Sequence, residues 1–222
     1  MSDPTVALVE PLPLPRRPFE SDDEMYIAEA IELGTKSLVD VPVRYQHATV
    51  TVSAIAEYVR SLVARSREVS PQRLVRIGPA ITVGKSLLLL GPTGVGKSFE
   101  SYGVVRALAV SGARVNWVFT SAADCYAKLR PRPHVDSEHE FERYANAGFL
   151  VLDDLGAAKS SEWVEEINYR LINFRYEREK PTLVTSNLQP KDLKASIGDR
   201  VASRLVEMAD RVVLTGPDRR RA

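Results

Sequence analysis

The sequence has few of the features that exported or membrane-embedded proteins need. Its 222 residues include one cysteine, Cys125, so no disulfide can form within the chain, and we expect a reducing, cytoplasmic location. No uninterrupted apolar run is longer than Leu87–Leu90, which is far too short to span a bilayer. The stretch from Met1 to Pro18 lacks the apolar core of a signal peptide. We therefore expect no membrane partner.

The sequence also lacks a large net charge of either sign. Its formal charge at pH 7 is +1, so binding of nucleic acid would depend on a local basic patch rather than on the field of the whole protein. The charges are unevenly distributed along the chain. Nine acids and three bases give residues 1–40 a charge of −6, whereas six arginines and two glutamates give residues 41–80 a charge of +4.

The N-terminal part of the chain divides into two segments by composition. Residues 1–40 are an acidic arm, and its proline-rich residues 1–23 are predicted to be disordered because they cannot bury enough apolar surface to offset the entropy of ordering. A short helix is predicted from Glu24 to Leu33, ending at Gly34. Residues 41–80 are a basic lead-in to the rest of the chain.

The lead-in and the remaining residues, 81–222, show the periodicity of regular structure. Apolar residues recur at helical spacing over 53–66, and from residue 85 aliphatic strands alternate with helices. Such alternation predicts an α/β domain in which helices cover both faces of a five-stranded parallel sheet. The predicted strands are 86–90, 114–119, 149–152, 182–185 and 211–214, and the predicted helices are 97–110, 122–129, 138–145, 161–178 and 201–208.

A glycine-rich loop, Gly91-Pro92-Thr93-Gly94-Val95-Gly96-Lys97-Ser98, lies between the first predicted strand and the first predicted helix of this domain. Glycines let the backbone fold around phosphate oxygens, and the freed N–H groups and the helix N-terminus attract negative charge. Lys97 is expected to reach the β- and γ-phosphates of ATP, and the Ser98 hydroxyl is expected to bind Mg²⁺. Val83-Gly84-Lys85-Ser86 repeats the end of the motif, but it lacks the first glycine and precedes a strand, so we interpret this copy as coincidence.

Two acids, Asp153 and Asp154, follow the third predicted strand. Asp153 would hold Mg²⁺ directly or through water, and Asp154 would orient or deprotonate the attacking water. An aspartate at position 154 is shorter than the glutamate common in such sites, which is consistent with slow hydrolysis. The alternative is a solvated strand end before a turn at Gly156.

Polar and basic side chains extend the candidate catalytic set. Asn187 follows the fourth strand, where the carboxyl ends of parallel strands converge, and would sense the γ-phosphate or hold the lytic water; a plain turn is the alternative. Arg200 and Arg204 lie about one helical turn apart. We interpret Arg204 as an arginine delivered to the γ-phosphate of a neighbouring subunit, with Arg200 in support. Surface ion pairs with Asp199 or Glu207 are the alternative.

The order of the motifs along the chain is the most specific feature of the sequence. After the glycine-rich loop come Leu152-Asp153-Asp154-Leu155-Gly156, Thr185-Ser186-Asn187-Leu188, Gly198-Asp199-Arg200-Val201-Ala202-Ser203-Arg204-Leu205 and Gly216-Pro217-Asp218-Arg219, and before it comes Val41-Pro42-Val43-Arg44-Tyr45-Gln46-His47-Ala48. Together they resemble the DnaC/IstB branch of the AAA+ ATPases, over about residues 41–222.

The resemblance implies a P-loop NTPase fold of the AAA+ type and ATP-dependent assembly into homo-oligomers, in which an arginine of one subunit completes the site of the next. By position, Asn187 matches sensor 1 and Arg204 matches the arginine-finger segment. Arg44 and Tyr45 would lie near the adenine, and Phe99 would join the nucleotide-binding residues of the loop. The family binds single-stranded or distorted DNA. DnaC-type members load the replicative helicase, whereas IstB-type members assist a transposase.

The sequence departs from the family in three places. Phe99-Glu100-Ser101 replaces the expected Thr-His-Leu type of continuation after the loop. A full C-terminal helical lid is not expected, because the sequence stops at Ala222. Arg219–Arg221 would then either replace a sensor 2 arginine or form a solvated basic tail. The acidic arm matches nothing in the family.

From these features we expect a DnaC-like ATPase that acts on DNA in replication, with ATP and Mg²⁺ as cofactors and single-stranded DNA and the replicative helicase as partners. An IstB-like transposition helper is the first alternative. The second alternative is an ATP-dependent binding switch with negligible hydrolysis. The basic loop Arg130-Pro131-Arg132-Pro133-His134 is either a DNA contact or a plain surface loop.

Overall fold

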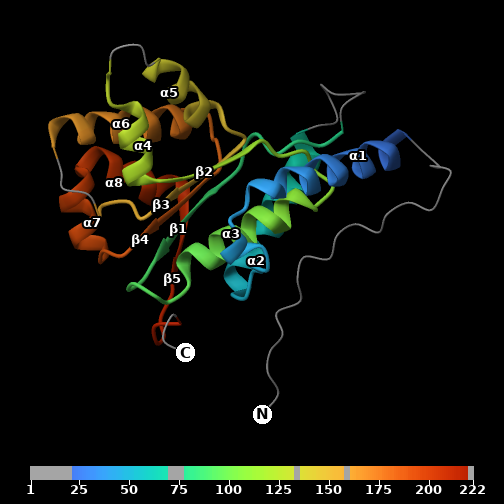
Figure 1. The fold of residues 1–222 in the computed structure, drawn as a ribbon, viewed down its shortest axis with the longest axis horizontal. Coiled ribbons are helices and arrows are strands. Elements are labelled where there is room, and N and C mark those ends of the chain that lie inside the picture. Colours follow the sequence, from blue (N-terminus) through green and yellow to red (C-terminus); the bar gives the residue numbers. More distant parts are fainter. Residues whose placement is uncertain (1–21, 70–77, 133–135, 158–160, 220–222) are drawn as a thin grey trace. The chain divides into compact units, whose positions relative to one another are not determined.

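The computed structural model describes residues 22–69, 78–132, 136–157 and 161–219. The chain forms two compact units, which are described separately below (Figure 1). The first comprises the described residues up to Gly84 together with Phe99–Asn116, and the second comprises Lys85–Ser98 and the described residues from Trp117 onward. Disorder was predicted for residues 1–23: residues 1–21 lie outside the described residues, and the prediction is wrong for Asp22 and Asp23, which begin a helix.

The second unit contains a parallel sheet with the strand order β2-β3-β4-β1-β5. The strands are β1 (Ser86–Leu90), β2 (Trp117–Ser121), β3 (Phe149–Asp153), β4 (Thr182–Ser186) and β5 (Ala209–Val213). Strands β1 and β4 are buried along their whole length, which is why they appear in the sequence as short apolar runs without alternation. The predicted five-stranded parallel sheet is confirmed. The largest difference from the predicted strand bounds is in β2, which begins at Trp117 rather than at residue 114. Arg114 lies outside this strand and forms an isolated β-bridge with Ala80.

Five helices of the second unit pack on one face of this sheet (Figure 1). They are α4 (Ala122–Leu129), α5 (Ser137–Asn146), α6 (Glu162–Glu177), α7 (Pro190–Ile197) and α8 (Asp199–Met208). Leu88, Leu150 and Val184 of the sheet join one apolar core with residues of all five helices. Helix α7 was not predicted from the sequence. Its first residue is Pro190, at a position where a proline loses no intrahelical hydrogen bond.

A fully buried arginine joins α5 to the start of β4. The guanidinium of Arg175 donates hydrogen bonds to the carbonyl oxygens of Tyr144, Ala145, Ala147 and Pro181, over 2.8–3.1 Å. Carbonyl groups at the end of a helix carry partial negative charge, so they stabilise a buried cation. Arg175 therefore has a structural role that its position within a predicted helix does not reveal.

The first unit contains α1 (Asp22–Ser37), the 3₁₀ turns η1 (Leu38–Asp40) and η2 (Val43–Tyr45), α2 (Ser53–Val69) and the part of α3 (Lys97–Ala109) from Phe99 onward. The predicted end of the first helix at Gly34 is wrong, because α1 continues to Ser37. A methyl group at position 34 would lie 1.8 Å from the carbonyl oxygen of Ala109. Gly34 therefore permits close packing of α1 against α3, and it does not cap the helix.

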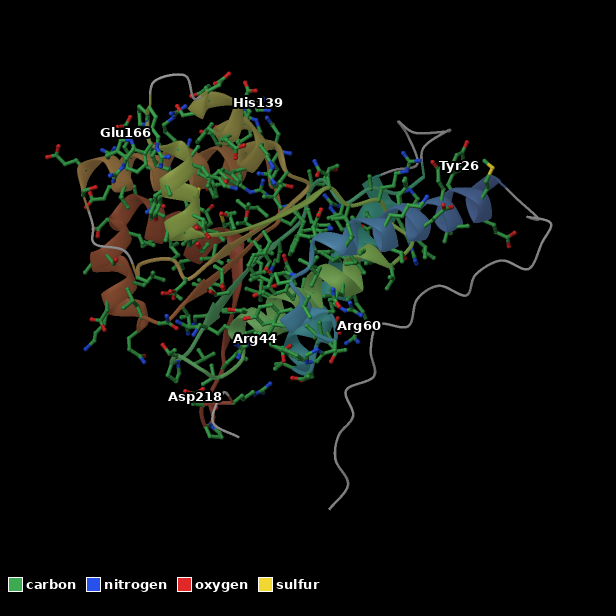
Figure 2. The ribbon with its side chains drawn as sticks, viewed as in Figure 1. Tyr26, Arg44, Arg60, His139, Glu166 and Asp218 are labelled. Atoms are coloured by element: carbon green, nitrogen blue, oxygen red, sulfur yellow. The ribbon has the colours of Figure 1, made fainter. Side chains whose placement is uncertain are left out.

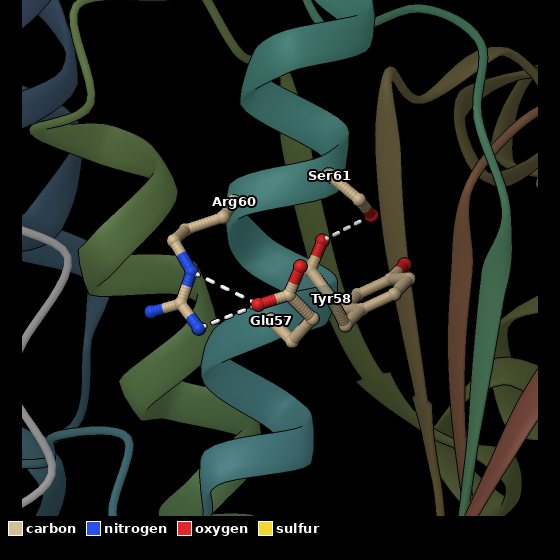
Figure 3. Close-up of polar contacts among 4 residues, drawn as sticks. All are labelled: Glu57, Tyr58, Arg60 and Ser61. Atoms are coloured by element: carbon tan, nitrogen blue, oxygen red, sulfur yellow. Dashed lines mark hydrogen bonds and ion pairs between the residues drawn. The ribbon is translucent and has the colours of Figure 1, made fainter.

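The predicted helix over 53–66 is confirmed in α2, which has one buried and one exposed side. Ile55, Val59 and Leu62 are almost completely buried. Arg60 projects from α2 in Figure 2, and Figure 3 shows its guanidinium paired with the carboxylate of Glu57 at 2.6 Å. Ser61 also donates a hydrogen bond to the carbonyl oxygen of Tyr58 within the same helix (Figure 3). Arg60, Arg65 and Arg67 all lie on the exposed side of α2. Within the described ranges, no helix has the length and apolarity needed to cross a bilayer.

Candidate nucleotide-binding site

The glycine-rich loop connects β1 to α3 and ends at Lys97, the first residue of that helix. Gly94 and Gly96 have φ angles of 88° and 102°, in a region that residues other than glycine rarely adopt. Backbone N–H groups at the N-terminus of a helix favour an anion, so the conformation suits phosphate binding, which stays a prediction of the motif.

Lys97 is buried and connects the loop to the end of β4. Its ammonium group donates hydrogen bonds to the carbonyl oxygens of Gly91 and Pro92, at 2.7 and 2.9 Å, and to Oδ1 of Asn187 at 2.5 Å. A buried ammonium group needs such acceptors, because it has lost its water. The structure thus brings together two residues, Lys97 and Asn187, that are far apart in the sequence.

Asp153 at the end of β3 lies between two hydroxyl groups. Ser98 donates a hydrogen bond to Oδ2 of Asp153 at 2.9 Å, and Thr185 donates one to Oδ1 at 2.6 Å. Hydroxyl and carboxylate oxygens are ligands that Mg²⁺ prefers, and Mg²⁺ commonly binds through one or two carboxylates together with substrate phosphates. The two residues predicted to hold the metal ion therefore lie together and have the right chemistry.

Asp154 has a positive φ of 61°, which is uncommon for a residue other than glycine. Its backbone N–H donates to Oγ1 of Thr185 at 2.8 Å, and its carboxylate accepts a hydrogen bond from Nδ2 of Asn187. Such an unusual backbone angle persists only where neighbouring groups hold it, and here two side chains at the end of β4 do so.

Thr185 contributes to this site, although no role was predicted for it from the sequence. Its fully buried hydroxyl contacts both acids: it donates to Asp153 and accepts from the backbone of Asp154. The available signal was a threonine at the carboxyl end of one strand beside a strand that ends in acids. That signal is weak, because strand order is needed to know that β3 and β4 are neighbours.

The residues predicted to lie near the adenine, together with Phe99, belong to the first unit. Tyr45 stacks on Tyr102 of α3 with ring centroids 4.5 Å apart, and the ring of His47 lies 5.7 Å from that of Phe99. Arg44 is exposed. Tyr45 and Phe99 therefore both have aromatic or imidazole neighbours within this unit, and their contact with a nucleotide stays a prediction.

The departure from the family after the loop has a structural explanation. Glu100 is fully buried and accepts hydrogen bonds from both the backbone N–H and the hydroxyl of Thr51. Glu100 therefore fixes the segment before α2 to α3, which gives the acid a structural role.

Arg204 lies on α8 and is held by side chains of α6. Its Nε donates to Oδ1 of Asn173 at 2.6 Å, and its guanidinium lies 5.0 Å from the ring of Tyr169 and 5.6 Å from that of Tyr176. Arg200 lies over the same Tyr169 ring at 5.8 Å, and its carbonyl oxygen accepts a hydrogen bond from Arg204 at 3.1 Å.

The acids considered as alternative partners of these arginines have other contacts. Asp199 pairs with Lys194 at 3.3 Å, and Glu207 accepts a hydrogen bond from the Tyr176 hydroxyl at 2.7 Å, which raises the pKa of Tyr176. Arg204 is therefore held by neutral groups that leave its positive charge available.

The segment that follows β5 returns to the glycine-rich loop. Leu214 donates its backbone N–H to the carbonyl oxygen of Leu90 at 2.7 Å, and Arg219 donates its own to the carbonyl oxygen of Gly94 at 2.9 Å. A methyl group at Gly96 would lie 3.1 Å from a guanidinium nitrogen of Arg219. The backbone of Arg219 is thus attached to the loop, while residues 220–222 lie outside the described residues.

The remaining candidates have packing roles. Cys125 is buried in the core of the second unit, and burial raises the pKa of its thiol to about 12, so it acts as a small apolar residue. Trp163 packs against the same core and lies 6.3 Å from Tyr126, edge to face. Arg130, at the start of the basic loop, lies 5.4 Å from the Trp163 ring, and DNA contact by this loop stays a prediction.

Comparisons with known proteins show the family to which the chain belongs. The family described as IstB-like ATP binding protein matches residues 63–218. A protein named as an insertion-sequence ATP-binding protein of Mycobacterium tuberculosis is 26% identical over 147 residues, which make up 63% of this chain and 57% of that protein. The replicative helicase loader DnaC of Buchnera aphidicola is 23% identical over 124 residues, 54% of this chain and 50% of that protein.

A solved structure supports the same fold. The crystal structure of the DnaC helicase loader superposes with a TM-score of 0.59 at 23% identity, covering 78% of this chain and all of that chain. The AAA+ P-loop fold predicted from the sequence is confirmed by this likeness and by the parallel sheet. The chain spans 57% and 50% of the lengths of the two curated relatives.

Proposed function

Because this chain belongs to the IstB-like ATP-binding protein family, we propose that it hydrolyses ATP to ADP and phosphate at the site described above. The observation that carries the proposal is the direct connection between the loop and the acids. Lys97 contacts Asn187, Asn187 contacts Asp154, and Ser98 contacts Asp153. Within one subunit, the residues proposed to bind phosphate and metal are therefore hydrogen-bonded to the amide and the acid at the ends of the neighbouring strands.

The proposed roles follow from these contacts. Lys97 and the loop backbone bind the phosphates, and Ser98 and Asp153 hold Mg²⁺, which when bound offsets phosphate charge. Asp154 orients the attacking water and takes its proton, and Asn187 fixes the Asp154 carboxylate by donating to it. Thr185 positions both acids and is not itself catalytic.

We further propose that the protein works as a homo-oligomer in which Arg204 of one subunit reaches the ATP of the next. Within the described residues, the contacts of Arg204 are with α6 and α8, and they include none with the glycine-rich loop of its own chain. A guanidinium that keeps its charge is suited to stabilising the negative charge that develops on the γ-phosphate. Arg200 supports it by holding the same aromatic ring.

The biological partner is proposed to be single-stranded DNA together with a replicative helicase, which this protein would load or remodel. The fold similarity to the DnaC helicase loader, which covers all of that chain, favours this role. The relative from an insertion sequence favours the alternative role of a transposition helper. The first unit supplies the proposed partner-binding surface, with α2 as the candidate element.

The first experiment is a pull-down with ATP, using purified replicative helicase and transposase from the same source as baits. Retention by the helicase alone is the expected result, and retention by the transposase alone would establish the alternative. Lys97→Ala is the matched control, because capture that depends on ATP should disappear with it.

Hydrolysis is separated from a binding switch by counting turnovers. The proposal predicts more than one ATP hydrolysed per subunit when single-stranded DNA is present. A single turnover or none, with ATP bound tightly, would instead establish the switch.

A further inference from the structure

The segment after β5 lies directly against the glycine-rich loop at several points. A methyl group at Gly91 would lie 2.3 Å from the carbonyl oxygen of Leu214, and the backbone of Arg219 is hydrogen-bonded to Gly94. In Figure 1 this segment is the red chain below β5, beside the loop that joins β1 to α3. All of these residues belong to the second unit.

An acidic side chain of this segment lies at the loop. A methyl group at Gly94 would lie 2.1 Å from Oδ1 of Asp218 and 2.3 Å from its Cγ, so the carboxylate lies against the α-carbon of that glycine. Figure 2 labels Asp218 at this end of the second unit. Asp218 is only partly exposed, and the hydrogen bond from the next residue, Arg219, holds it in register with the loop.

The position has an electrostatic consequence. The loop backbone, the N-terminus of α3 and the Lys97 ammonium group all favour a negative charge in this region. Asp218 brings a negative charge to the same loop. A phosphate chain in the loop brings further negative charge to the same region, and like charges repel strongly where water is partly excluded.

We propose that Asp218 is an internal competitor of the nucleotide phosphates, whose carboxylate is displaced when ATP or ADP enters the loop. The proposal rests on the proposed ATP site and adds a control on its affinity. Arg219 is a natural control, because it lies beside the same loop with the opposite charge.

The test compares Asp218→Asn, which keeps the shape and removes the charge, with the unaltered chain by titration calorimetry. Dissociation constants are measured for ATP, ADP and adenosine, with and without Mg²⁺. Asp218→Asn should bind ATP and ADP about three- to tenfold more tightly and adenosine equally well, because only the phosphates meet the carboxylate. Arg219→Gln should shift ATP affinity in the opposite direction.

Salt provides a second measurement on the same variants. The difference in ATP affinity between Asp218→Asn and the unaltered chain should shrink as salt rises, because screening weakens the repulsion that the variant removes. If this difference in ATP affinity did not change with salt, competition by the charge of Asp218 would be refuted.

Other outcomes overturn the proposal in distinguishable ways. Equal ATP affinity of the two proteins would refute competition by Asp218 and leave the ATP site intact. If Asp218→Asn bound ATP more weakly than the unaltered chain, and only when Mg²⁺ was present, Asp218 would be a metal ligand instead of a competitor. If neither protein bound ATP, the proposed function itself would fail, and with it the competition.

Discussion

The loop side of the second unit and the α6–α8 side hold their charged groups in opposite ways. At the loop, Lys97 is linked to Asp154 through Asn187, and Ser98 donates a hydrogen bond to Asp153, so charged groups of both signs share hydrogen-bonded partners. On α8, Arg204 is fixed by an amide and two aromatic rings, which orient the guanidinium without neutralising it. The difference supports the proposal that the loop receives a nucleotide and that Arg204 is presented to the nucleotide of another subunit.

The largest expected effect comes from removing the cation at the centre of the loop. Lys97→Ala should weaken ATP binding by at least about 100-fold, because a buried ammonium group and its contact with Asn187 are lost. Fluorescence titration with a labelled ATP analogue measures it. Lys85→Ala is the control from the near-duplicate motif, since Lys85 forms an exposed ion pair with Asp210 at 3.0 Å, and it should bind ATP normally. If Lys97→Ala still bound ATP tightly, the loop would not be the ATP-binding site.

The second effect tests the other region. Arg204→Ala should leave ATP binding unchanged and lower the rate of hydrolysis by about 10³-fold, if the guanidinium acts on the transition state of a neighbouring site. Arg178→Ala is the matched control, because Arg178 is an exposed arginine that lies 3.8 Å from the Phe174 ring on α6. Equal losses in the two variants would mean that stacked arginines here act only through stability.

The third effect concerns the positioning of the acids. Thr185→Ala should lower kcat by about 10- to 100-fold with little change in ATP affinity, because both acids lose the hydroxyl that orients them. Thr185→Ser keeps the hydroxyl and should recover most of the rate. A rise in KM with unchanged kcat would place Thr185 in ligand binding instead.

The smallest effect concerns the positioning of the arginine. Asn173→Ala should lower kcat by about three- to tenfold, because Arg204 loses one hydrogen bond and keeps its two aromatic neighbours. The double variant with Arg204→Ala should be no slower than Arg204→Ala alone, since the two residues act through the same guanidinium. Additive losses would show that Asn173 acts independently.

The loop region was predicted from the sequence more successfully than the contacts of Arg204. The strands and the loop were predicted well because a buried parallel strand appears as a short apolar run and the loop has fixed glycine spacing. The partners of Arg204 were not predicted, because Asn173 is 31 residues away and its contact depends on how α6 packs against α8. Acids close in sequence were the natural guess, and they bind elsewhere.

Two other differences have the same origin in tertiary packing. Gly34 looked like a helix end because glycine ends many helices, yet here it allows α1 to approach Ala109 closely. Thr185 and Asp218 belong to two of the sequence motifs, but their roles depend on which groups the fold places beside them. Local sequence indicates which residues are available, and only the packed structure indicates what they contact.

The central claim is that the loop of one subunit and Arg204 of another make one complete site. The most direct measurement mixes Arg204→Ala with Asp154→Asn, each inactive alone, and follows ATP hydrolysis across mixing ratios. The account predicts recovered activity that is greatest at intermediate ratios, because an intact loop then meets an intact arginine at some interfaces. No recovery at any ratio, in a mixture shown to co-assemble, would contradict it.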